Sequence, residues 1–182
     1  MGEFIKPTCQ SELSEKNKSL RIKYCMRHLN FNFRRVLFSD ESTFQLNSNN
    51  QKIFRARGIT PFKKRKFNPN HKIMVWGGIS YYGKTSLYIV NGNLDGEAYL
   101  TLLKKKRREI LHIFRHRKIW FFQQEGAPGH RPKKIKSYIK NWLTKKILPH
   151  PAQSPDLNPI ELIWAQMKRM VEKKGRNLKH NY

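Results

Sequence analysis

Short apolar runs bounded by turn residues predict the strands of a buried sheet. HKIMVWGGIS, at 71–80, is the strongest of these runs, and its two adjacent glycines, Gly77 and Gly78, indicate a bulge or a close approach of another part of the chain. The predicted strands are 36–38, 53–54, 71–80, 85–92, 119–122 and 147–148. The runs between 71 and 92 are joined by a short turn, which favours antiparallel pairing.

Apolar residues at helical spacing predict four helices between and after these strands. The first is short and lies at about 20–30, after a polar segment, 1–20, that shows no period and is expected to form an arm or linker. The second covers about 96–114, with Asp95 as its cap, and the third begins at Pro132. The fourth begins at Asn158 and Pro159, a good cap followed by a residue suited to the first helical position. The residues expected to face inward are Tyr99, Leu102, Leu103, Ile110 and Phe114 in the second helix, Ile135, Tyr138, Ile139 and Trp142 in the third, and Ile160, Ile163, Trp164, Met167 and Val171 in the fourth. Strands mixed with helices in this way predict an α/β domain.

The charge of the chain indicates its class of partner. Its 182 residues include 38 Lys and Arg but only 12 Asp and Glu, which gives a formal net charge of +26. Such an excess predicts salt-dependent attraction to a polyanion, and nucleic acid fits better than a membrane, since no stretch approaches the roughly 18 apolar residues that span a bilayer. The N-terminus lacks the apolar segment of a secretory signal. Cys9 and Cys25 are too few for a disulfide framework or a zinc site and are expected to be reduced intracellular thiols.

Two basic clusters are candidate DNA contacts. The first, bracketed by Phe62 and Phe67, suits phosphate contact combined with base stacking, although a solvated loop would look the same. The second lies on the predicted helix over 96–114, where it should be mostly exposed, and it fits a solvated face, a DNA contact or a nuclear-import signal. The residues of the two clusters are Lys63, Lys64, Arg65 and Lys66, and Lys104, Lys105, Lys106, Arg107 and Arg108.

Three carboxylates occupy comparable places in the predicted fold. Asp40 and Glu125 each follow a core strand, and Glu161 lies in the first turn of the last helix. Each has an ordinary explanation as well: a turn residue for Asp40, and a capping-box partner of Asn158 for Glu161. In a strongly basic protein, however, three carboxylates suit the binding of two Mg²⁺ or Mn²⁺ ions for phosphoryl transfer. His130 follows Glu125 and would either help to position DNA or make a hydrogen bond at a helix start.

Three blocks of the sequence carry a family resemblance. VLFSDESTF, FFQQEGAPGH and LPHPAQSPDLNPIELIW resemble, in their order, the signature blocks of the Tc/mariner superfamily of transposases, and the resemblance extends over about residues 20–172. It implies an RNase H-like fold, that is, a mixed five-stranded sheet with helices on both faces. It also implies a catalytic centre in which Asp40, Glu125 and Glu161 bind two Mg²⁺ or Mn²⁺ ions, and which cleaves DNA at transposon ends and joins the 3′-hydroxyl to target DNA.

The sequence departs from the family pattern in several places. The second acidic residue is Glu125, where the family has Asp, and one more residue than usual separates it from Glu161. Gly129 stands where the family commonly has a larger residue, and no paired helix-turn-helix domains for reading transposon ends precede the catalytic blocks. The expected organisation is therefore a linker remnant at 1–30, a truncated catalytic domain at 31–174 and a basic tail at 175–182.

Two functions follow from the same ancestry. One is a transposase catalytic domain that acts on double-stranded DNA, as a homodimer by analogy with the family and in the nucleus if the host is eukaryotic. The other is a catalytically dead relic that acts as a basic DNA-binding or interaction module. A nuclease or RNA-binding protein unrelated to transposition would explain the charge and the aromatic residues but not three family blocks in order.

Overall fold

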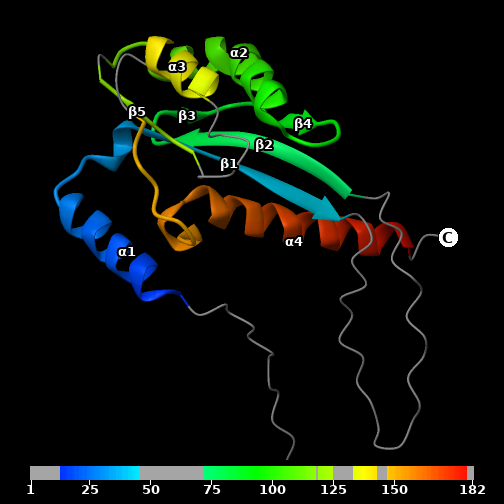
Figure 1. The fold of residues 1–182 in the computed structure, drawn as a ribbon. Helices are drawn as coiled ribbons and strands as arrows, with labels where there is room; N and C mark the ends of the chain where they lie inside the picture. The colour runs from blue at the N-terminus through cyan, green and yellow to red at the C-terminus, as the bar shows by residue number, and fades with distance from the viewer. Residues whose placement is uncertain (1–12, 46–71, 118, 125–132, 143–146, 180–182) are drawn as a thin grey trace, which may run out of the picture.

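A five-stranded mixed sheet lies between two layers of helices in the computed structural model, which describes residues 13–45, 72–117, 119–124, 133–142 and 147–179 (Figure 1). The strands are β1 (Val36–Gln45), β2 (Lys72–Ser80), β3 (Gly83–Lys84), β4 (Tyr88–Val90) and β5 (Phe121–Gln123). The helices are α1 (Glu15–Arg27), α2 (Gly96–Ile113), α3 (Lys133–Trp142) and α4 (Ile160–Lys179), with short 3₁₀ turns at Phe33–Arg35 and Pro155–Leu157. No helix in these described ranges has an apolar stretch long enough to cross a membrane.

The sheet is ordered β3-β2-β1-β5. Strand β4 pairs with the same edge of β2 as β3 does, but with the first half of that strand. Strand β1 is antiparallel to β2 and parallel to β5, and an isolated parallel bridge joins Phe122 of β5 to Ile147. The predicted strands at 71–80 and 85–92 are therefore present, the second shortened to β4, while the predicted strand at 53–54 lies outside the described residues. The predicted strand at 147–148 is reduced to that bridge, and Ile119 is 52% exposed because β5 begins only at Phe121.

The two faces of the sheet carry separate cores. Helices α2 and α3 cover one face, and α4 runs along the other, with α1 beyond the start of β1 (Figure 1). The larger core lies on the α2 side and is built mainly from Leu37, Trp76, Val90, Tyr99, Leu102, Leu103, Ile110, Phe114, Trp120, Phe122, Ile135 and Ile139. All five predicted inward residues of α2 are buried there, which confirms its helical pattern.

Helix α4 presses its apolar stripe against β1 and β2. Ile160 and Trp164 are buried with Phe44 and Val75, and Met167 and Val171 pack at the edge of this cluster. Ile163, expected in the stripe, is instead 39% exposed. The segment from residue 175, expected to be a tail, continues α4 as helical backbone as far as Lys179.

The first helix is longer than the pattern predicted. It begins at Glu15 because Ser14 caps it, accepting a hydrogen bond from the backbone N–H of Asn17, and an ion pair between Glu15 and Lys18 supports its first turn. Part of the expected arm at 1–20 is thus helical, although α1 has no buried residue. The helix is tied to the loop before α4 by polar contacts rather than by an apolar stripe.

Candidate active site

Asp40 lies within β1 and not after it, contrary to the prediction that the strand ends at Phe38. The strand continues to Gln45 because β2 pairs with every residue from Phe38 onwards. The parallel pairing with β5, by contrast, ends at Phe38 and Gln123. Asp40 is therefore two residues beyond the parallel part of the sheet, which is where functional groups gather in such folds, and it is only 4% exposed.

The side of the sheet that Asp40 faces follows from strand alternation. Phe38 and Phe44 belong to the apolar clusters on the α4 side, whereas Leu37 belongs to the core on the α2 side. Because side chains alternate along a strand, Asp40 shares the α4 side with the two phenylalanines. Directly opposite Asp40 in β2 is Gly77, whose missing side chain leaves room for the indole of Trp164 in α4.

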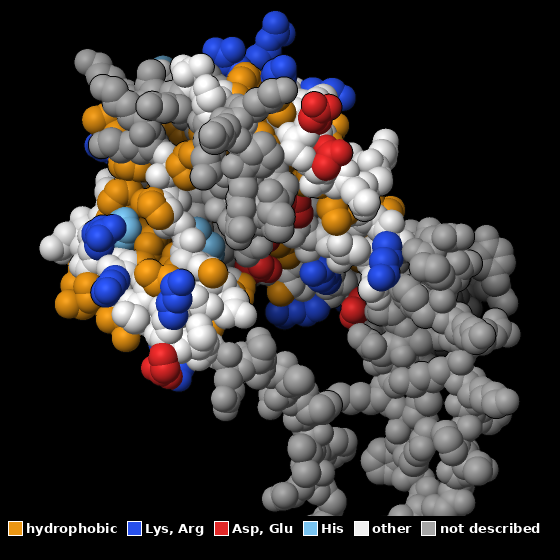
Figure 2. Space-filling view, viewed as in Figure 1, with side chains coloured by type: hydrophobic (Ala, Val, Ile, Leu, Met, Phe, Trp, Pro, Cys, Tyr) orange, Lys and Arg blue, Asp and Glu red, His pale blue; other side chains and the backbone are white. Residues whose placement is uncertain are grey.

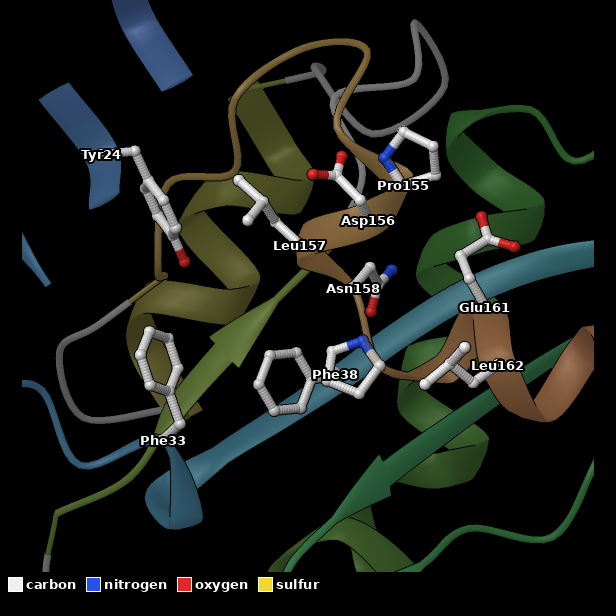
Figure 3. Close-up of a pocket in the computed structure, with 10 residues that line it drawn as sticks. Tyr24, Phe33, Phe38, Pro155, Asp156, Leu157, Asn158, Glu161 and Leu162 are labelled. Atoms are coloured by element: carbon white, nitrogen blue, oxygen red, sulfur yellow. The ribbon is translucent and has the colours of Figure 1, made fainter. Parts of the chain in front are cut away.

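Glu161 is brought to the same side by the first turn of α4. Its neighbour Ile160 is 1% exposed and fixes that turn against the β1–β2 pair, which leaves Glu161 half-buried. Figure 3 shows Glu161 and Phe38 at one apolar hollow of about 670 Å³, which Tyr24 and Phe33 also line. Asp40 and Glu161, from elements more than a hundred residues apart in sequence, thus lie on the same side of the sheet.

The capping-box interpretation of Glu161 is wrong. Asn158 is 2% exposed, and neither its Oδ1 nor its Nδ2 has a hydrogen-bond partner among the described residues. The backbone alone starts the helix, with the N–H of Glu161 donating to the carbonyl of Asn158 at 3.1 Å. Glu161 is therefore not held by the cap that its position suggested.

Behind Asp40, on the α2 side, a buried tyrosine joins α2 to the end of β5. Tyr99 is fully buried and its hydroxyl donates to Oε1 of Gln124 at 2.8 Å. The neighbouring Ser39 donates from its hydroxyl to the carbonyl of Gln123 at 2.9 Å. Burial raises the pKa of Tyr99 well above its usual range, and the charges of Glu41 and Asp40 raise it further, so the phenol stays protonated and can donate. Tyr99 was predicted only as a core residue, because spacing does not reveal what a hydroxyl binds.

Several predicted site residues lie outside the described residues: Glu125, His130, and Lys63, Lys64, Arg65 and Lys66. Their placement in the site stays a prediction. Within the described ranges, no group of three or more His, Cys, Asp or Glu side chains is close enough to hold a metal ion. Two of the three predicted carboxylates are thus described, and the expected triad depends on Glu125.

The basic cluster of α2 divides between surface and interior. Lys104, Lys105, Arg107 and Arg108 are exposed, as expected. Lys106 is only 6% exposed, so the prediction that it lies on the surface is wrong. Its ammonium donates to the hydroxyl of Ser86 and to Glu109, 2.8 Å away. Burial opposes ionisation of Glu109, but the hydrogen bonds from Lys106 and Ser86 outweigh it and lower the pKa of that carboxyl. Lys106 therefore ties α2 to the segment before β4.

The loop that precedes α4 is braced by α1, a contact that sequence analysis missed. Arg21 makes a two-pronged ion pair with Asp156, with N–O distances of 2.7 and 2.6 Å, and Asn17 donates to the side chain of Gln153 at 2.7 Å. The hydrogen bonds from Arg21 lower the pKa of Asp156. The brace holds the segment that leads to Glu161. Figure 2 shows basic side chains spread over this view of the molecule, with acidic ones among them.

Comparison with solved structures defines the class of fold. The chain superimposes on the catalytic domain of the Mos1 transposase in a structure with raltegravir and Mg, with a TM-score of 0.67 and 20% identity over 88% of this chain and 75% of that one. It also matches the Mos1 mariner paired-end complex with Mn, with a TM-score of 0.75 and 21% identity over 94% of this chain and 54% of that one. The mixed five-stranded sheet with helices on both faces is thus the RNase H-like fold, as predicted.

Sequence comparison then gives the family. The family model described as DDE superfamily endonuclease matches residues 35–181. The Tc3 transposase of Caenorhabditis elegans is 31% identical over 165 residues, and the Tcb2 transposase of Caenorhabditis briggsae is 29% identical over 185 residues. These matches cover 87% and 91% of this chain but 49% and 63% of the relatives, so the chain spans half to two-thirds of their length. The chain belongs to the DDE superfamily endonucleases, in the branch of the Tc1/mariner transposases.

Proposed function

We propose that this domain binds double-stranded DNA and carries out metal-dependent strand cleavage and strand transfer at transposon ends. The observation that supports the proposal is that Asp40 and Glu161 lie on the same side of the sheet, the side of α4, with Asp40 just beyond the end of the parallel β1–β5 pair. The net charge of +26 supplies the attraction for the phosphodiester backbone.

The residues of the site fit the metals that this chemistry uses. Asp40 and Glu161 offer hard carboxylate oxygens, which Mg²⁺ and Mn²⁺ prefer, and Glu125 would be the third ligand. Structures of the related Mos1 paired-end complex are described with Mn and with Mg. When bound, two such ions would activate the attacking oxygen and stabilise the leaving oxygen of a phosphodiester. The protein's own task would be to hold the carboxylates in place. In this proposal β1 positions Asp40, while the buried turn at Ile160 and the Arg21–Asp156 brace position Glu161.

The partners follow from the same relatives. Mos1 has been solved as a paired-end complex with a left transposon end and as a strand transfer complex. By analogy, this chain would act on transposon ends and target DNA as a homodimer, with the exposed residues of the α2 cluster among its DNA contacts. In a eukaryotic host it would work in the nucleus.

The change from Asp to Glu at the second position favours one competing function, a relic that binds DNA without cleaving it. A carboxylate extended by one methylene moves by more than the few tenths of an ångström that metal sites tolerate. Both functions predict DNA binding, so only metal binding and chemistry separate them.

Metal binding is tested by thermal unfolding with and without millimolar Mn²⁺. Ligand at ten times its Kd stabilises the folded state by about 1.4 kcal/mol, which raises the midpoint of a domain of this size by about 3–6 °C. Asp40→Asn should abolish this increment. Glu41→Gln is the matched control, since it removes a carboxylate from the next residue of β1, on the opposite side of the sheet.

Glu125→Asp separates active enzyme from relic. If the unmodified chain responds to Mn²⁺, strand transfer of a labelled duplex with a free 3′-hydroxyl follows as the assay of activity. A response only in Glu125→Asp would show that the site survives but has lost its metal, which supports the relic. If none of the variants responds, the assignment of the metal site is wrong.

A further inference from the structure

A second site lies away from the carboxylates, where the end of α2 meets the β2–β3 hairpin. A pocket of about 380 Å³ opens there, and basic side chains dominate its lining. These are Lys84 from β3 and His112, Arg115, His116 and Arg117 from the last turn of α2 and the residues after it. None of the described residues that line this pocket is acidic.

The basic side chains of the pocket are held in place by one another and by an aromatic ring. Arg115 donates to Nε2 of His112 at 2.6 Å and to Nε2 of His116 at 2.9 Å. The guanidinium of Arg117 stacks 4.4 Å above the ring of Tyr82 and donates to the carbonyl of His116 at 3.2 Å. The permanent positive charges of the cluster are those of Lys84, Arg115 and Arg117. The two guanidinium groups are exposed, and each contacts side chains or backbone of the protein.

These charges have no counter-ion within the described part of the chain. The ion pairs that join Lys18 to Glu15, Arg21 to Asp156 and Lys106 to Glu109 lie elsewhere. The C-terminus of a helix attracts cations through its free carbonyl groups. Arg117 donates to such a carbonyl, that of His116, whereas the side chain of Arg115 donates to histidine rings. Clustered cations that lack a carboxylate form a site for an external anion.

We propose that this pocket binds a phosphate group of the DNA backbone. The proposal rests on the DNA-binding function above and adds a second point of contact to it. Guanidinium groups suit phosphate because their N–H groups match two of its oxygens at once. The pocket lies at the β3 edge of the sheet, on the α2 side, whereas Asp40 faces the α4 side. In the sheet, Lys84 pairs with Ile79 of β2, and Asp40 pairs with Gly77, two residues away on the same strand. Ordinary strand spacings therefore separate the backbones of Lys84 and Asp40 by roughly 12 Å.

The salt dependence of DNA binding tests the site independently of the metal. Affinity for a duplex is measured at several salt concentrations in EDTA, so that the carboxylate site contributes no metal. Each lost phosphate contact should lower the slope of log Kd against log salt by about 0.9. We expect Arg115→Gln/Arg117→Gln to lose about 0.9 to 1.8 of this slope and to bind several-fold more weakly at about 0.15 M salt.

The matched control is Lys16→Gln/Lys23→Gln, which removes two charges from exposed positions on α1. If the control lowers the slope as much as the double arginine variant does, the pocket is no specific contact and the proposal falls. Should the arginine variant unfold early, Lys84→Gln alone gives the same comparison at an exposed side chain. If no Mn²⁺ test gives a response but the arginine variant still lowers the salt slope, the proposed cleavage activity is refuted and the phosphate site is supported.

Ring signals of His112 and His116 identify the anion. Both rings should shift in NMR spectra when a short duplex is added at micromolar concentration, since the phosphate would compete for the donors of Arg115. Inorganic phosphate at the same concentration should leave them unchanged. A shift with inorganic phosphate but not with duplex would assign the pocket to a free phosphate and overturn the DNA contact. No shift with either would overturn the site itself.

Discussion

Gly77 is the position where a single added carbon should disturb the site most directly. It faces Asp40 across β1 and β2, and a Cβ at this position would lie 3.0 Å from Cη2 of Trp164 and 3.3 Å from a methyl of Leu87. The indole has little freedom to retreat, since Trp164 is 2% exposed and meets the ring of Phe44 edge-on at 6.1 Å. Gly77→Ala must therefore push α4 away from the sheet.

The cost follows from two opposing effects. Overpacking a tight site costs about 1–3 kcal/mol, while alanine gains about 0.5–1 kcal/mol over glycine within a strand. We expect Gly77→Ala to lower the free energy of unfolding by about 1–2 kcal/mol, or the thermal midpoint by about 2–8 °C for a domain of this size. Because α4 carries Glu161, the stabilisation by Mn²⁺ should also shrink.

Gly78→Ala is the matched control for this prediction. It makes the same change one residue further along β2, where the nearest atoms to the new Cβ would be those of the Leu37 side chain, at 3.3 Å or more. Leu37 is also fully buried, but this contact is looser than the 3.0 Å contact at Gly77, so the control should lose less stability than Gly77→Ala. Urea unfolding of both variants, alone and with Trp164→Phe, measures the coupling. Equal losses at the two glycines, or a loss at Gly77 that the smaller ring does not relieve, would refute the packing argument.

Three further predictions concern groups around the site. Arg21→Gln should lower stability by about 0.5–1 kcal/mol at pH 6. Arg21 lowers the pKa of Asp156 in the folded state. The stability difference between the two chains is therefore present above the unfolded pKa of about 3.9 and disappears as the pH falls through the folded pKa. Urea midpoints at several pH values measure it. Lys106→Met should cost about 1–2 kcal/mol in urea unfolding but leave the salt slope of DNA binding unchanged, whereas Lys105→Met should do the reverse. Tyr99→Phe should cost about 1–2 kcal/mol by leaving the amide oxygen of its partner unsatisfied, and it should weaken Mn²⁺ stabilisation several-fold if that contact positions the predicted second carboxylate.

Contrary results would be plain in each case. A difference for Arg21→Gln that persists unchanged below the folded pKa of Asp156 would show that the ion pair is not its cause. A lower salt slope for Lys106→Met would mean that this side chain leaves its buried position to contact DNA. Full Mn²⁺ stabilisation in Tyr99→Phe would confine the hydroxyl to a packing role.

The sequence predicted α2 well because two independent signals agree there. Asp95 caps the helix through hydrogen bonds from the N–H groups of Glu97 and Ala98, and the apolar spacing marks the buried side. Lys106 shows the limit of that reasoning. It falls on the same side as Leu103 and Ile110, so spacing alone would have placed it inside, but its charge and its basic neighbours suggested the surface.

Apolar spacing predicted only the second part of α1, at about 20–30, and missed its start at Glu15, since none of its residues is buried. The helix is held by the packing of Tyr24 against the start of β1 and by the two-pronged contact of Arg21 with Asp156, a residue that lies 135 positions further along the chain. Contacts of that range leave no local pattern in a sequence. The same holds for the hydroxyl of Tyr99 and its amide partner Gln124, just after β5.

The position of Asp40 explains how one strand, β1, can carry both a proposed metal ligand and a side chain that holds the neighbouring strand β5. The polar run from Ser39 to Ser42 suggested that the strand had ended, yet pairing with β2 continues through it. Alternation then separates neighbours: Asp40 turns to the side of α4 and Glu161, while Ser39 turns to the side of α2, where its hydroxyl binds the end of β5. A loop at this place would leave both side chains free to move. Because the strand continues, the carboxylate of Asp40 and the hydroxyl of Ser39, which binds β5 just before Glu125, lie on one strand that is hydrogen-bonded to β2 and β5. A shift of β1 against β2 should therefore disturb both side chains at once.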